Sequence, residues 1–80
     1  MSVPQWKVGP FQIGFRSQDV GEPPHVHVWS ERGHAKVWLQ PVTLARSHGF
    51  GSHDLDLVLK VVTENAGWLI AEWDRYWQHA

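Results

Sequence analysis

The spacing of apolar residues changes once along this 80-residue chain, near Ser52. Before that residue apolar and polar side chains alternate, as around Val26 and Val28, which is typical of strands with one buried face. After it apolar residues recur every three or four positions in one stripe, which is typical of an amphipathic helix. The stripe consists of Leu55, Val58, Leu59, Val62, Ala66, Leu69, Ile70, Trp73 and Trp77. The two spacings predict an α+β fold, in which an antiparallel meander of four to five strands packs on a long C-terminal amphipathic helix.

Turn-forming residues divide the first part of the chain into strands. Gly9-Pro10 and the segment 30–33 each separate two alternating segments, so each predicts a hairpin. The third strand is expected to begin only after the proline pair that ends at Pro24, because proline cannot donate to a ladder. Pro41 interrupts the fourth strand, and the residues after it predict a short fifth one.

The chain is long enough for one domain, 1–80, with the meander in 1–46 and the helix in 52–78. Ser52 is a suitable N-cap for the helix. A helix of this length measures roughly 40 Å, about twice the width of a four-stranded sheet. It is therefore expected to overhang the sheet or to bend, with a kink near 65–67.

The alternation also predicts which side chains share a face. Val26 and Val28 point inward, whereas His25, His27 and Trp29 point to the outer face of the sheet. Lys36 and Trp38 of the next strand share that outer face. The expected core comprises Trp6 or Phe11 together with Ile13, Phe15, Val26, Val28, Val37, Leu39, Leu55, Leu59, Val62, Ile70 and Trp73.

Composition excludes several classes of protein. The chain has no cysteine, so it offers neither disulfides nor a thiolate metal site. A net charge of -1 argues against a protein that binds nucleic acid along an extended phosphate backbone. The basic residues nevertheless outnumber the acidic ones before Ser52, so a local anion site near the histidines remains an option. No leader-like start and no bilayer-spanning apolar run occur, so we expect a cytoplasmic protein without a membrane contact.

The chain also carries several short motifs in sequence. Pro23-Pro24-His25-Val26-His27-Val28 is followed by Ala35-Lys36-Val37-Trp38-Leu39, by Pro41-Val42 and Leu44-Ala45-Arg46, and by a helical tail with Trp73 and Tyr76. In this order and spacing the motifs resemble a family of small bacterial proteins catalogued as a domain of unknown function, over nearly the whole chain. Gly67-Trp68 departs from that pattern, in which polar or small helix-forming residues are more usual. Family members are often encoded beside a second small protein, so the resemblance implies a toxin-antitoxin-like pair.

His25 and His27 are the candidate metal ligands, because residues two apart on a strand can both reach one ion. Neutral imidazole suits a divalent transition metal such as Zn, Ni, Cu or Fe. A third ligand would have to come from a loop; the candidates are Asp19, Glu22, Glu31, His34, His48 and His53. The alternative is a pair of histidines that only face solvent or hydrogen-bond to each other.

The same pair can act without metal as general acid and base on RNA, with Arg46 stabilising the developing anion. Arg32 and Lys36 are alternatives to Arg46 in that role. The sequence offers no separate nucleophile and no glycine-rich phosphate loop for such an enzyme. The tryptophans on the same face are expected to cover the sheet rather than to stack on a base.

The third hypothesis is a protein-interaction module. On a helical wheel Leu57, Val61 and Trp68 fall roughly opposite the apolar stripe, so one helix cannot bury both sets against the same sheet. Such an exposed strip is typical of a homodimer or of a contact with a small partner protein, unless a helix end folds back over it. We rank protein interaction first and histidine chemistry second.

Overall fold

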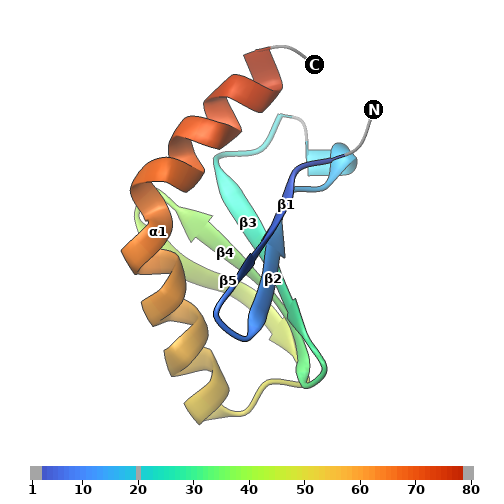
Figure 1. Ribbon diagram of the computed structural model, residues 1–80, viewed down its shortest axis with the longest axis vertical. Coiled ribbons are helices and arrows are strands. Elements are labelled where there is room, and N and C mark those ends of the chain that lie inside the picture. Colours follow the sequence, from blue (N-terminus) through green and yellow to red (C-terminus); the bar gives the residue numbers. More distant parts are fainter. Residues whose placement is uncertain (1–2, 20, 79–80) are drawn as a thin grey trace.

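The computed structural model describes residues 3–19 and 21–78 as a five-stranded antiparallel sheet with one long helix packed on one face (Figure 1). The sheet is a simple meander in the order β1-β2-β3-β4-β5. The elements are β1 (Gln5–Val8), β2 (Phe11–Gly14), the short 3-10 helix η1 (Ser17–Asp19), β3 (His25–Ser30), β4 (Gly33–Leu39), β5 (Val42–His48) and α1 (Ser52–Gln78). The predicted α+β class, the meander and the long C-terminal helix are confirmed.

The connections form where the turn residues predicted them. Gly9 has a φ of 57°, which the first position of a two-residue type II′ hairpin requires and which glycine adopts at little cost. Two residues join β3 to β4, and the Gln40-Pro41 pair, whose peptide bond is cis, joins β4 to β5. Each strand therefore pairs with the next one in the sequence.

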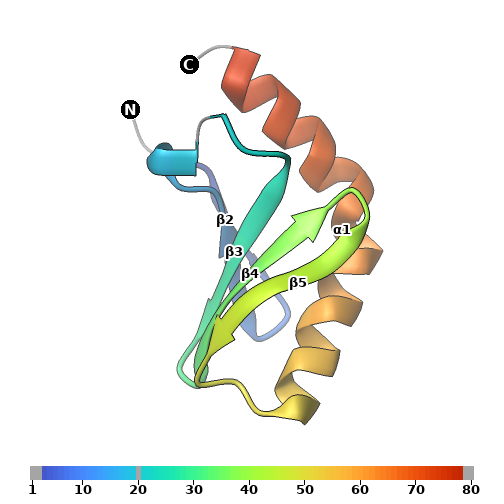
Figure 2. The same ribbon diagram turned by 180° about the vertical axis from the view of Figure 1, so that it is seen from behind.

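The register of the sheet sorts the side chains as the alternation predicted. Val28 lies between Ile13 on β2 and Ala35 on β4, and Val26 pairs with Val37, so these apolar residues share one face. Helix α1 covers this face, mainly over β3, β4 and β5, and runs along the whole length of the sheet (Figure 2). The core therefore lies between the helix and the valine-bearing face.

The core differs in part from the predicted one. It contains Phe11, Ile13, Phe15, Val26, Val28, Ala35, Val37, Leu39, Phe50, Val58, Val62, Leu69 and Trp73. Leu55, Leu59 and Ile70, predicted as core, are only partly buried and pack at its margin, as does Trp6. Phe50 was not predicted because it lies in a glycine-flanked connection, where periodicity gives no signal. Its ring packs edge-on against Phe11, with 6.0 Å between centroids.

The fifth strand is longer than predicted. It continues past Arg46, where the sequence placed the end of the meander, to His48. The pairing shifts between Lys36, which opposes Arg46, and Val37, which opposes Leu44, so Ala45 is an extra residue in β5. This β-bulge keeps Leu44 on the apolar face while Arg46 and His48 lie on the other one.

Helix α1 is unbroken through the segment 65–67, where the sequence indicated a kink. The Asn65 Nδ2 donates to the Val61 carbonyl at 2.7 Å, so this amide is satisfied inside the helix. Within residues 3–19 and 21–78, no helix combines the length and apolar character needed to cross a bilayer.

Candidate functional site

The sheet face opposite α1 carries the histidines and most of the basic side chains of the strands. We call it the polar face, and the register assigns its members. They are Gln5 and Lys7 on β1, Gln12 on β2, His25, His27 and Trp29 on β3, His34, Lys36 and Trp38 on β4, and Thr43, Arg46 and His48 on β5. The predicted sharing of one face by His25, His27, Trp29, Lys36 and Trp38 is thus confirmed.

The two histidines do not face solvent, which was one of the alternatives that the sequence left open. His25 and His27 are 0% and 1% exposed, although Val26 and Val28 on the opposite face are also buried. Strand β3 is the central strand, and His25 at its start is covered by one aromatic ring from β4 and one from α1. The His25 ring lies 5.4 Å from Trp38 and 5.0 Å from Trp73 of α1, centroid to centroid. Its Nδ1 donates to the Pro23 carbonyl at 2.9 Å, which fixes its tautomer.

His27, Trp29 and His34 form a stack of rings on β3 and β4. The two imidazoles are nearly parallel, with 5.3 Å between centroids and an interplanar angle of 5°. The Trp29 indole lies 5.8 Å from His27 and 5.6 Å from His34. His27 Nδ1 and His34 Nε2 are 3.2 Å apart and share one hydrogen bond.

Two cations pack against the indoles of the polar face. Lys36 is buried, and its Nζ lies 4.7 Å from the centre of the Trp38 ring and 2.6 Å from a Glu22 carboxylate oxygen. The Arg16 guanidinium lies over Trp29, 5.8 Å from the ring centre. Indole faces attract cations, and both contacts hold positive charge close to the histidine stack.

Further basic residues lie on β5, the strand at one edge of the sheet. His48 lies opposite His34, and Arg46 lies opposite Lys36. Arg46 and His48 are exposed. Burial lowers the pKa of His34 below its ordinary value of 6.5, and the positive charges of Arg16, Arg46 and His48 lower it further. The lowered pKa favours the neutral form of His34.

Of the residues predicted as a third metal ligand, His34 contacts His27, but it does not complete a metal site with His25 and His27. Among the described residues no group of three histidine, aspartate or glutamate side chains is arranged to hold an ion. Glu22 pairs with Lys36, Glu31 lies in the β3–β4 turn, and His53 lies at the start of α1. The Asp19 side chain lies outside the described part of the chain. The metal-binding role of His25 and His27, and their catalytic role with Arg46, stay predictions.

Leu57, Val61 and Trp68, here called the helix strip, lie on the flank of α1 next to the β1–β2 hairpin. Leu57 and Trp68 are 37% and 38% exposed, whereas Val61 is partly buried against the core. The Trp68 ring packs edge-on against Trp6 of β1, with 5.0 Å between centroids. Its Nε1 donates to the Asn65 Oδ1 at 2.7 Å, so both ends of the side chain are held in place.

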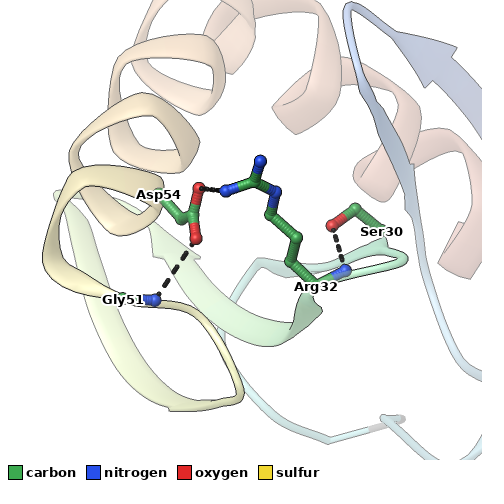
Figure 3. A network of polar contacts seen from close by, with 4 residues as sticks. All are labelled: Ser30, Arg32, Gly51 and Asp54. Atoms are coloured by element: carbon green, nitrogen blue, oxygen red, sulfur yellow. Dashed lines mark hydrogen bonds and ion pairs between the residues drawn. The ribbon is translucent and has the colours of Figure 1, made fainter.

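The helix strip continues at Leu57 into a surface hollow of about 550 Å³. Its lining comprises Lys7, Pro10, Phe11, Gln12, Trp29, Ser30, Glu31, Arg32, His53, Asp54 and Leu57. At its rim Arg32 forms an ion pair of 3.3 Å with Asp54, whose second oxygen accepts a hydrogen bond from the Gly51 amide (Figure 3). The Arg32 amide donates to the Ser30 hydroxyl, which closes the β3–β4 turn. The sequence did not reveal this hollow, because its walls come from three segments far apart along the chain.

Comparison with known proteins gives one match. A family model described as Domain of unknown function (DUF4160) matches residues 11–74, which include β2 to β5 and most of α1. No curated protein and no solved structure matches the chain significantly.

Proposed function

Because the chain belongs to the family described as a domain of unknown function (DUF4160), a description that names no activity, we propose its function from its own surface. The protein is a protein-interaction module that binds a second small protein through the helix strip, Leu57, Val61 and Trp68. This association takes place in the bacterial cytoplasm, in a toxin-antitoxin-like pair of the kind that the motif resemblance implies.

The exposure of Leu57 and Trp68 is the observation that carries the proposal. These are the large apolar side chains that stay exposed among the described residues, and both lie on one flank of α1. An aromatic residue that covers apolar surface next to a hollow is the usual anchor of a protein contact. Trp68 is already held by Trp6 and Asn65, so little side-chain entropy is lost when a partner packs on it.

The charge of α1 as a whole indicates the chemistry of the partner. Glu64 flanks the helix strip, Asp56 and Asp74 are exposed elsewhere on α1, and acidic residues outnumber basic ones along the helix. A partner surface that combines apolar with basic side chains is complementary to this helix. Two copies of the chain would bring like charges together, so the charges favour a different protein over a second copy.

The test is co-expression with the small protein encoded beside the gene, followed by co-purification and sedimentation of the complex. Trp68→Glu should weaken the association more than tenfold, since removal of a central aromatic anchor costs about 2 kcal/mol or more. Leu57→Glu should act in the same direction and leaves the Trp6–Trp68 contact intact. Thr63→Glu is the matched control, because it adds the same charge to an exposed position of α1 outside the helix strip.

Circular dichroism should show the same helix content in all three variants. A complex that survives both Trp68→Glu and Leu57→Glu would overturn the choice of surface. A dimer of the chain alone that dissociates on Trp68→Glu would overturn the choice of partner in favour of a second copy.

A second candidate function is histidine chemistry on the polar face, as metal binding or as RNA cleavage with His25, His27 and Arg46. The observation that favours it is the contact of 3.2 Å between the His27 and His34 nitrogens, next to cationic side chains. This function requires both His25 and His27. Substitution of either one should abolish the cleavage of RNA, or the binding of Zn, Ni or Cu measured by titration. Buried imidazoles need a local opening of the covering rings before they reach either ligand.

A further inference from the structure

The two layers of the molecule carry opposite charge. Before Ser52 the sequence has five lysine and arginine residues and three acidic ones, and from Ser52 onward it has five acidic residues and two basic ones. The strands therefore provide a cationic layer although the whole chain has a net charge of -1. An anionic ligand that approaches the polar face meets this layer with the acidic helix behind it.

Two neighbouring cross-strand pairs on the polar face are built from basic residues on both strands. Lys36 opposes Arg46 and His34 opposes His48. Lys36 and Arg46 are directly opposed like charges, which destabilise a sheet, so this pair is not explained by cross-strand attraction. Glu22 neutralises Lys36. Among the described residues, Arg46 forms no ion pair.

The same place combines charge with ring surfaces. Trp29 and Trp38 are half-buried on either side of the two basic pairs, and Arg16 extends over Trp29 toward the histidine stack. A guanidinium can bind two phosphate oxygens at once, and imidazole and indole rings offer flat surfaces on which a base can stack. Carboxylate ligands would use only the first of these features.

We propose that the polar face is a binding site for the phosphate group of a nucleotide unit, with Arg46, His34 and His48 as its ligands and Arg16 at its margin. The nucleotide unit belongs either to a single-stranded RNA or to a free nucleotide, since both present the same phosphate and base. The site lies on the sheet face opposite α1, its ligands are not part of the helix strip, and it does not depend on the interaction proposed for that strip.

Fluorescence anisotropy with a short labelled single-stranded RNA tests this proposal, at about 50 mM and about 200 mM salt. Arg46→Gln should weaken binding about tenfold, which is the effect of losing one charge-assisted contact. His48→Gln should weaken it by a smaller factor. Lys60→Gln is the matched control, because it removes the same charge from the exposed surface of α1 and should leave the affinity within about twofold.

Competition by a nucleoside monophosphate and by inorganic phosphate distinguishes the sources. Displacement of RNA by the monophosphate assigns the site to single nucleotides, and RNA binding without such displacement assigns it to a strand. In both cases the ring protons of His34 and His48 should shift in NMR spectra. Absence of binding, or equal losses for Arg46→Gln and Lys60→Gln, would overturn the proposal, because the second result indicates only diffuse attraction to charge.

Discussion

At the scale of single residues, the polar face is governed by how each basic group is compensated. The Lys36 ammonium is buried, and its Glu22 carboxylate and Trp38 ring replace the water that it loses. The exposed Arg46 keeps its hydration and needs no such partner. His34 lies between these extremes: it is half-buried and surrounded by positive charge, so the neutral form is favoured. The pH dependence of stability therefore contains a contribution from this side chain.

We predict that the protein loses stability as the pH falls below 6.5, in part through His34. Its pKa is lowered in the folded state, so the unfolded chain binds the proton more tightly. The contribution is fully present above 6.5 and is lost as the pH falls through the lowered pKa. His34→Gln should flatten the decline of the free energy of unfolding, measured by urea denaturation between about pH 8 and about pH 5.

His53→Gln is the control for this measurement, since it removes an exposed histidine at the start of α1. An equal flattening by both substitutions would contradict the assignment to His34. So would a stability that rises on acidification, because a raised pKa in the folded state would be needed for it.

At the scale of elements, some features of α1 and the hairpins could be predicted from the sequence and others could not. The hairpin turns were predicted, because Gly9-Pro10 and the segment 30–33 have local conformational preferences. The helix starts at Ser52 as predicted, but Gly51 takes the cap position expected for Ser52, and its amide donates to the Asp54 carboxylate. The bulge at Ala45 was not predicted, because an extra residue in an exposed edge strand leaves no periodic trace. The burial of His25 was missed since Trp73, which covers it, lies in another element far along the chain.

The continuity of α1 through Gly67 leads to a prediction for this helix. A Cβ added at Gly67 meets no atom within 4 Å, so Gly67→Ala introduces no clash. It should raise the free energy of unfolding by about 0.5–1 kcal/mol, because alanine restricts the unfolded chain and favours the helix. Thermal or urea denaturation would measure the change.

Gly49→Ala provides the contrast for Gly67→Ala. Gly49 has a φ of 88°, and an added Cβ would lie 2.5 Å from the Arg32 carbonyl oxygen. This substitution should destabilise the protein by more than about 1 kcal/mol. A destabilising effect of Gly67→Ala would instead indicate that the helix departs from regular geometry at that residue.

At the scale of the whole molecule, one apolar core joins the sheet to the helix. The core residues of β2 to β4 pack directly on Val58, Val62 and Leu69 of α1, and Trp73 contacts both Phe15 and His25. Neither layer can bury its apolar face without the other, which is expected for a domain of this size. The sequence predicted this two-layer arrangement from its two apolar spacings alone.

We therefore predict a single cooperative unfolding transition. Far-UV circular dichroism, which follows mainly α1, and tryptophan fluorescence, which follows both layers, should give coincident curves in urea. A helix signal that persists after the fluorescence change would mean that α1 is stable without the sheet, contrary to the shared core.

The bulge at Ala45 has a consequence for the behaviour of the protein at high concentration. Strand β5 is a seven-residue edge strand, and an edge of that length is a template on which further chains can add strand by strand. The extra residue breaks the regular spacing of the outward amide and carbonyl groups, and the charged Arg46 follows immediately. Strand β1 at the opposite edge has only four residues. Both edges are thus poor starting points for fibrous aggregation, and deletion of Ala45 would remove the protection at the longer one.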